Sequence, residues 1–184
     1  AGTYTCNIYD YNFCNLTKVV TIYEPDVVES SGNITSNYNG EDISCYGEND
    51  GSAFVQASGG SGPYNYLWSN GQTGDSLQNV VAATYTCTIT DAKGCVEPVP
   101  FQLTLIDPFP LTISVSPVDI ICYGDTNGQA IATINGGTPG AYVYDWSNGV
   151  ITNQTLQTTN TITNLSLGTY SCNIYDINNC MTTS

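Results

Sequence analysis

Cysteine is the residue whose number and spacing most directly indicate chemistry in this chain. Eight cysteines occur among 184 residues, histidine is absent, and no CxxC pair exists, so the sequence does not fit a zinc site. Regularly placed cysteines are typical of an oxidising compartment, where they form disulfides. The disulfide candidates are Cys6, Cys14, Cys45, Cys87, Cys95, Cys122, Cys172 and Cys180.

The sequence does not indicate a catalytic site. Without histidine or arginine, a Ser-His-Asp or Cys-His arrangement cannot form within the chain. The acidic residues recur at turn positions, which favours a structural role over a carboxylate pair for glycoside hydrolysis. We therefore expect that the chain is not an enzyme and carries no organic cofactor.

Two acidic loops could hold Ca²⁺. Glu48 and Asp50 come shortly before one glycine, and Asp125 and Asn127 come before another, so that oxygen ligands stand at alternate positions. The EF-hand spacing is absent, and Asp or Asn followed by Gly is also ordinary turn chemistry. The competing interpretations are a low-affinity calcium site and a simple turn.

The charge of the chain excludes some partners. Two lysines stand against sixteen acidic residues, giving a formal net charge of −14. Such a chain cannot neutralise phosphates, so we expect no nucleic-acid binding, and anionic membrane surfaces should repel it. No apolar run is long enough to insert directly into a membrane. We expect an internal segment of a longer secreted chain, because no initiator Met or signal peptide begins it.

Internal repeats organise the sequence. The run GTYTCNIYDYNFC at residues 2–14 returns as ATYTCTITDAKGC at 83–95 and as GTYSCNIYDINNC at 168–180. The run C-Y-G-x-x-x-G begins at Cys45 and again at Cys122, and Y-x-Y-x-W-S-N-G begins at Tyr64 and Tyr142. Acidic-Pro pairs at 24–25 and 107–108 mark boundaries. They predict the C-terminal strands of a preceding repeat at 1–25, a complete repeat at 26–108, and a following repeat at 109–184 that lacks its last strand.

Each repeat is predicted to be all-β. β-Branched and aromatic residues alternate with polar ones between Gly, Asn and Asp turns. Tyr85, Cys87 and Ile89 should face inward, and the threonines between them should face solvent. About seven short strands, a Trp on a central strand and a Tyr two residues before a Cys predict an immunoglobulin-like sandwich. A generic β-barrel is the alternative.

Taken together, these three runs resemble the SprB-type repeats of Bacteroidota gliding-motility adhesins. The resemblance covers essentially the whole chain, although Ala83 replaces the usual Gly and the second repeat has a longer insert after Trp146. It implies tandem immunoglobulin-like sandwiches in an extended array, outside the cell at the bacterial surface, exported by type IX secretion. It also implies a stalk or filament segment of a large adhesin that mediates attachment or gliding through multivalent weak contacts.

Two other functions fit the sequence. One is a purely structural, self-assembling extracellular filament, and the other is a carbohydrate-binding accessory array of a secreted enzyme. The expected partners are neighbouring repeats of the same chain, other copies in a filament, and a substratum or polysaccharide. Tyr46 and Tyr123 lie in loops and are candidates for surface contact. Ser76 lies in a short run that resembles a Bacteroidota O-glycosylation motif and is a candidate for a glycan.

The odd number of cysteines leaves the disulfide pairing open. Each repeat after the first boundary has three cysteines, so one of them must be free or bonded outside its repeat. Within one repeat the competing pairs are Cys45–Cys87 and Cys45–Cys95. We predict that the remaining cysteine links neighbouring repeats or chains, and a buried free thiol is the alternative.

Overall fold

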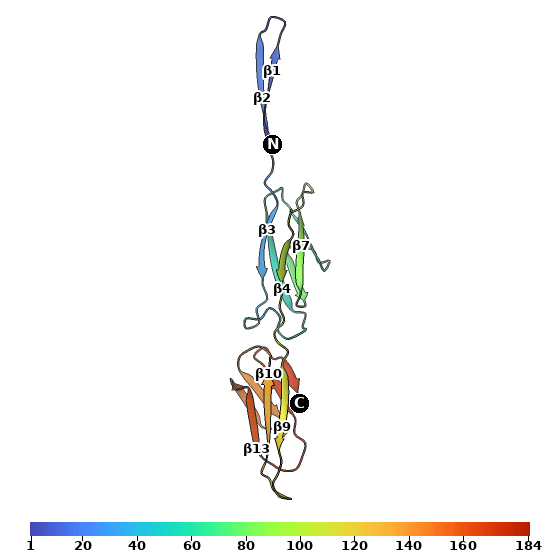
Figure 1. The fold of residues 1–184 in the computed structure, drawn as a ribbon. Helices are drawn as coiled ribbons and strands as arrows, with labels where there is room; N and C mark the ends of the chain where they lie inside the picture. Colours follow the sequence, from blue (N-terminus) through green and yellow to red (C-terminus); the bar gives the residue numbers. More distant parts are fainter.

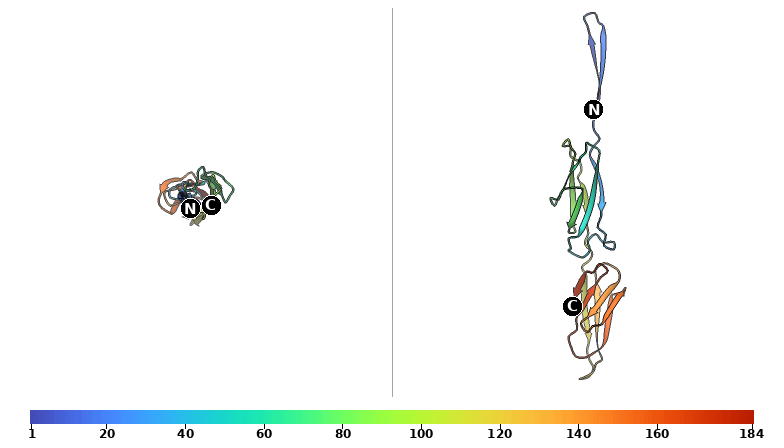
Figure 2. Two further views of the ribbon diagram at one scale, coloured as in Figure 1. Left: turned by 90° about the horizontal axis from the view of Figure 1, so that it is seen from above. Right: turned by 180° about the vertical axis from the view of Figure 1, so that it is seen from behind.

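The chain folds into a hairpin followed by two β-sandwiches arranged end to end (Figure 1). The computed structural model describes residues 1–184, apart from the side chain of Gln154. Viewed from above, the parts lie over one another, so the molecule is a narrow rod (Figure 2). No helix in the described part of the chain is long and apolar enough to cross a membrane.

The N-terminal hairpin consists of β1 (Gly2–Tyr9) and β2 (Asn15–Ile22). The two strands are antiparallel and pair without interruption from Gly2–Ile22 to Tyr9–Asn15. Both strands are exposed along almost their whole length, including the alternate positions that carry Tyr4 and Ile8. The hairpin therefore presents to solvent the same kind of side chains that the complete repeats bury.

The first complete sandwich is built from two three-stranded antiparallel sheets. One sheet has the order β3-β4-β6 and the other has the order β5-β7-β8. The strands are β3 (Glu29–Ile34), β4 (Gly51–Ser58), β5 (Asn65–Trp68), β6 (Ser76–Val80), β7 (Thr84–Thr90) and β8 (Phe101–Thr104).

The second sandwich repeats this plan with one additional strand. Its sheets have the orders β13-β10-β9 and β12-β11-β14-β15. The strands are β9 (Thr112–Val118), β10 (Gly128–Asn135), β11 (Tyr142–Trp146), β12 (Ile151–Thr155), β13 (Thr159–Leu165), β14 (Cys172–Tyr175) and β15 (Met181–Thr183). The insert after Trp146 supplies β12, which explains its greater length.

The strand order in these sheets is immunoglobulin-like. In the usual letters, β3-β4-β6 is the A-B-E sheet and β5-β7-β8 is the C-F-G sheet, and β12 of the second repeat adds a C′ strand. Both repeats also have the tyrosine corner of that fold. Tyr85 donates its hydroxyl hydrogen to the Val81 carbonyl at 3.0 Å, and Tyr170 does the same to Ser166 at 3.1 Å. The predicted immunoglobulin-like all-β fold is confirmed.

Alternation along the strands explains why these sequences form sandwiches. On β7, Tyr85, Cys87 and Ile89 are buried and the threonines between them are not, as the period-two pattern predicts. Trp68 and Trp146 are almost completely buried, one in each core. Their indole N–H groups are satisfied by the Gly74 carbonyl at 3.0 Å and by Asn160 Oδ1 at 2.8 Å.

Two details differ from the sequence prediction. The first repeat has six strands, one fewer than the approximate count predicted. The second repeat does not entirely lack its last strand, because β15 pairs with β14 through Tyr175–Met181. Phe101, which pairs with Cys87, comes six positions after Cys95. Ser184, which accepts a hydrogen bond from the N–H of Cys172, comes only four positions after Cys180. The shorter connection brings the start of the last strand inside residues 109–184.

Truncating Leu77 should test the first core directly. Leu77 is fully buried on β6, so Leu77→Ala should lower the free energy of unfolding of this repeat by about 2–5 kcal/mol. Urea unfolding followed by Trp68 fluorescence, in a Trp146→Phe background, isolates the first repeat. Gln78→Ala is the matched control, since Gln78 is exposed on the same strand. Equal midpoints for the two variants would contradict the assigned core.

Candidate functional site at the junction of the repeats

The most specific chemical feature of the molecule is a disulfide that joins the two sandwiches. Cys45 of the first repeat is bonded to Cys180 of the second, with an S–S distance of 2.03 Å and a Cα–Cα distance of 5.5 Å. Cys45 lies in the loop before β4, and Cys180 lies in the turn between β14 and β15. The bridge spans 135 residues of sequence and connects the facing ends of the two domains.

A buried aspartate positions Cys180 for this bond. Asp176 directly follows β14, and its Oδ1 accepts the backbone N–H groups of Asn178 and Cys180, both at 2.9 Å. Its Oδ2 accepts the N–H of Thr138 at 2.8 Å, which ties the turn to the neighbouring loop. Gly137 permits this approach, because it has φ +71° and a Cβ there would lie only 3.0 Å from Asp176 Oδ2. These hydrogen bonds hold the turn without using the disulfide.

Asn178 adds a hydrogen-bonded clamp beside the disulfide. Its Nδ2 lies 3.0 Å from the Tyr38 carbonyl and 3.1 Å from the Ser44 carbonyl, both in the first repeat. The same nitrogen is 2.9 Å from Thr138 Oγ1 in its own repeat, and Asn178 Oδ1 accepts a hydrogen bond from Asn39 Nδ2. The partly buried amide thus connects the two sandwiches next to the covalent bond.

The same turn is built in the first repeat. Asp91 Oδ1 accepts the N–H groups of Lys93 at 2.9 Å and Cys95 at 2.8 Å, and Oδ2 accepts that of Ser61 at 2.9 Å. Hydrogen bonding from the backbone N–H of Cys95, the largest influence, with the other N–H donors, lowers the pKa of Asp91 below its ordinary value. Asp10 accepts the N–H of Cys14 in the same way at 2.9 Å. All three copies of the run therefore use one device to hold the turn cysteine.

The structure separates the remaining cysteines into two kinds. Cys87 and Cys172 are buried in the two cores without a disulfide partner in the described chain, and burial raises the pKa of each thiol to about 11. Cys6, Cys14, Cys95 and Cys122 are exposed free thiols. The predicted pairs Cys45–Cys87 and Cys45–Cys95 are wrong, because Cys45 bonds across the junction instead.

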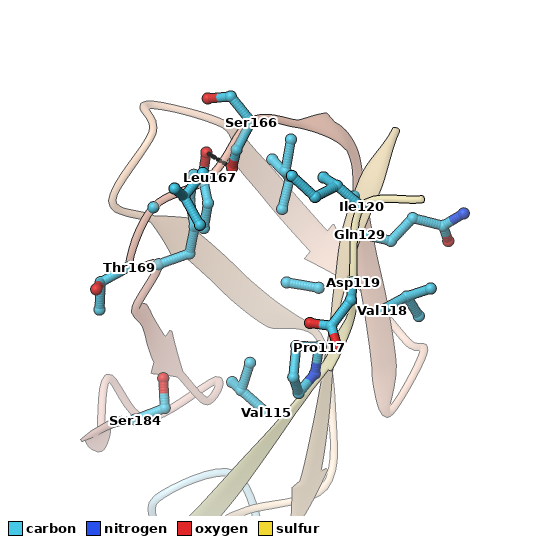
Figure 3. A pocket seen from close by; sticks show the side chains of 15 residues that line it. Val115, Pro117, Val118, Asp119, Ile120, Gln129, Ser166, Leu167, Thr169 and Ser184 are labelled. Carbon is cyan, nitrogen blue, oxygen red and sulfur yellow. Dashed lines mark hydrogen bonds between the residues drawn. The ribbon is translucent and has the colours of Figure 1, made fainter. Parts of the chain in front are cut away.

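The second repeat has an open cavity at its far end. The cavity has a volume of about 490 Å³ and lies between Val115 and Ile120 on one side and Leu167 and Thr169 on the other (Figure 3). In the first repeat the equivalent space is filled by Leu105, which is buried and donates its N–H to the Ala83 carbonyl at 3.0 Å. The cavity is thus the counterpart of a core position of the first repeat.

Three of the four candidate calcium ligands accept hydrogen bonds from backbone N–H groups within their own loops. Asp50 Oδ1 accepts the N–H of Ser44 at 3.1 Å, and Asn127 Oδ1 accepts that of Ile121 at 3.1 Å. Asp125 Oδ2 accepts the N–H of Cys122 at 3.2 Å, while Glu48 is exposed. Among the described residues, no group of three His, Cys, Asp or Glu side chains stands close enough to hold a metal ion. Calcium binding by these loops stays a prediction.

The other sequence candidates lie on the surface. Tyr46 and Tyr123 are exposed, and each directly follows the cysteine that opens the C-Y-G run. Ser76 is half-buried at the start of β6, and its hydroxyl lies 3.0 Å from the Asp75 carboxylate. The structure brings none of these three side chains together with another candidate, and glycosylation of Ser76 stays a prediction.

Sequence reasoning missed the aspartates and Asn178. A signal for the aspartates was present, because Asp10, Asp91 and Asp176 each precede a turn cysteine by four residues. Asn178 carried no such signal, since Lys93 and Asn12 occupy the equivalent positions and only the contact across the junction gives it a role.

Comparison with known proteins identifies the repeats. The family model described as SprB repeat matches residues 37–73 and 114–150, which contain the loop cysteine and the next two strands of each repeat. No curated protein matched the chain. Among solved structures, the chain is similar to the amphioxus IgVJ-C2 molecule, with 15% identity, a TM-score of 0.31, and coverage of 68% of this chain and 87% of that chain. The fold assignment comes from the strand order and not from this distant similarity.

The strand order defines immunoglobulin-like sandwiches, two of which follow one another in this chain. The family matches at two places in the chain support a SprB-type repeat protein. SprB repeats occur in cell-surface or extracellular proteins, and the family indicates a repeat segment of a cell-surface protein of the gliding or adhesin type.

The lowered pKa of Asp91 predicts a pH dependence of stability. A carboxylate whose pKa is lower in the folded state stabilises the fold above its unfolded-state value of about 3.9, and this stabilisation is lost as the pH falls through the folded-state pKa. Between pH 7 and pH 3, the first repeat should therefore lose more unfolding free energy in the wild type than in Asp91→Asn. Urea unfolding followed by Trp68 fluorescence measures the difference. Glu48→Gln, which removes an exposed carboxylate, should behave as the wild type.

Proposed function

We propose that this chain is a stalk segment of a large bacterial cell-surface adhesin, where it attaches cells to a surface by many weak contacts and has no enzymatic activity. The observation that carries the proposal is the end-to-end joining of two SprB-type sandwiches through a covalent and hydrogen-bonded junction. A flexible tether would not need such a junction. A rod that projects its contact surfaces away from a cell needs one.

The connection between repeats suits a chain under tension. Residues 24–28 enter the first sandwich at the end that faces the hairpin, and residues 105–108 leave at the opposite end toward the second sandwich (Figure 1). Pull on the chain therefore passes along the long axis of each domain. The Cys45–Cys180 bond is a second covalent connection between the two domains beside the linker, so both connections carry the tension.

The surface of the rod suits long exposure to water with little sticking between neighbours. A formal net charge of −14 keeps copies apart. Threonine pairs cover the exposed faces, such as Thr84 and Thr104, whose hydroxyls lie 2.8 Å apart across β7 and β8. Two lysines and no arginine leave few sites for trypsin-like proteases. These features support an extracellular location and export from the cell, for which type IX secretion is the route that the family implies.

Weak contact surfaces repeat along the rod. Tyr46 and Tyr123 occupy equivalent loops and are exposed, so each repeat offers one aromatic ring to a polysaccharide or other substratum. One such ring binds weakly. Linked copies bind together because each bound repeat raises the effective concentration of the next.

The exposed hairpin supports one alternative, a self-assembling structural filament. Tyr4 and Ile8 of β1 and Val20 and Ile22 of β2 are exposed, although the equivalent positions on β7, on β8 and directly after β8 face a core. These four side chains can be buried only if the remaining strands of a sandwich pack against the hairpin. A neighbouring segment of the same chain would extend a single-chain rod, whereas strands from another copy would build a filament.

Attachment should depend steeply on the number of linked copies. Beads that carry four fused copies should resist detachment by flow from a polysaccharide-coated surface about 10²-fold better than beads with the same number of single copies. Replacing both loop tyrosines, Tyr46→Ser with Tyr123→Ser, should remove most of the gain. Tyr23→Ser is the matched control, because Tyr23 is exposed outside these loops.

Two results would overturn the adhesive role. If beads with the repeats were retained no better than beads without protein at every copy number, adhesion would lie outside these repeats. The same lack of retention, combined with concentration-dependent polymerisation of the single chain in sedimentation, would favour the structural filament.

A further inference from the structure

The cysteines that face the two ends of each repeat fall into two equivalent sets. Loop cysteines, Cys45 and Cys122, open the C-Y-G run, and turn cysteines, Cys14, Cys95 and Cys180, each follow an aspartate by four residues. The one disulfide in the described chain joins a loop cysteine to the turn cysteine of the next repeat. Cys95 and Cys122 are the members of these sets that the two complete repeats leave exposed and unbonded.

The unbonded turn already has the conformation of the bonded one. The N–H of Cys95 donates to Asp91 Oδ1 at 2.8 Å, and the N–H of Cys180 donates to Asp176 Oδ1 at 2.9 Å. Further bonds repeat as well, since Gly94 and Asn179 donate to the carbonyls of these aspartates at 3.1 and 3.0 Å and have φ of +85° and +63°. Cys95 is thus presented in the way that Cys180 is presented to Cys45.

The unbonded loop also matches its bonded counterpart. The N–H of Glu48 donates to the Cys45 carbonyl at 3.0 Å, and the N–H of Asp125 donates to the Cys122 carbonyl at 3.0 Å. The glycine between them has a left-handed conformation in both loops, with φ of +83° at Gly47 and +88° at Gly124. Both halves of the bridge are therefore preformed where no partner is present.

The two free thiols lie at opposite outer ends of the two-repeat unit. Cys95 lines a shallow cavity with residues 24–28, the segment that leads from the hairpin into the first sandwich. Cys122 follows Ile120, which lines the cavity at the far end of the second sandwich (Figure 3). A repeat joined to either end would meet one of these cysteines, as the second repeat meets Cys45.

We propose that Cys95 and Cys122 form the same bridge with adjoining repeats, so that one loop-to-turn disulfide clamps every junction of the array. Cys95 bonds the loop cysteine of the repeat on its N-terminal side, and Cys122 bonds the turn cysteine of the repeat on its C-terminal side. This inference rests on the proposed array of repeats. The buried Cys87 and Cys172 are not used, because they lie in the cores where no partner cysteine can reach them.

Each bridge forms by thiol–disulfide exchange with an oxidising protein disulfide outside the cytoplasm. The thiolate of one cysteine attacks that disulfide and forms a mixed disulfide. The thiolate of the facing cysteine then displaces the carrier, forming the bridge. The carrier leaves as a dithiol, having taken up the two electrons and the two protons of the original thiols.

Peptide mapping of the native surface material without reduction tests the proposal. Free thiols are blocked with an alkylating reagent under denaturing conditions, and pepsin at low pH cleaves the chain without disulfide exchange. The expected result is that peptides with Cys95 and Cys122 are each recovered in a disulfide with a peptide of the opposite set. Cys45–Cys180 is the internal positive control, and alkylated Cys172 is the matched unbonded control.

Recovery of Cys95 and Cys122 in alkylated form without reduction would overturn the proposal. A bond between two turn cysteines or two loop cysteines would also overturn it, since it would join two like ends of repeats and not a loop to a turn. Electron microscopy of the same material tests the array of repeats separately from its disulfides. End-to-end rods with free thiols would contradict only the disulfides, whereas the absence of rods would contradict the array itself.

Discussion

The contact between the facing ends of two small sandwiches determines whether this chain is a rod or a string of loosely tethered domains. Each sandwich folds around its own core, so neither core holds the other in place. Orientation depends instead on the Cys45–Cys180 bond and on the amide of Asn178, which lies within hydrogen-bond distance of two carbonyls of the other repeat. Interfaces between domains are ordinarily mobile unless they are large and apolar. At this junction a covalent bond and directional hydrogen bonds provide the restraint.

The aspartate turn connects this junction to the domain core. Asp176 lies at the end of β14, directly after a strand whose inward side chains fill the core. Its carboxylate converts the end of that strand into a fixed turn by accepting three backbone N–H groups. Packing of the strand therefore determines the place of Cys180. Repetition of the same carboxylate at Asp91 allows every repeat to present a turn cysteine in one geometry.

Most of the fold could be predicted from the sequence, because period-two burial is a local property. The inward row of Tyr85, Cys87 and Ile89 and the buried Trp68 follow from alternation within single strands. The site could be predicted only in part. An odd number of cysteines per repeat implied one that is free or bonded outside its repeat, but the identity of any such pair depends on which domain ends face one another. That arrangement involves residues 135 positions apart, and no local pattern records it.

The rigidity of the junction is tested most directly by measuring whether the two sandwiches tumble as one body. ¹⁵N relaxation reports the rotational correlation of each repeat separately. We expect one common, anisotropic tumbling for both repeats in the oxidised chain, and separate tumbling after Cys180→Ser is combined with Asn178→Ala. Independent tumbling of the two repeats in the oxidised wild-type chain would contradict it, because the junction would then be a hinge.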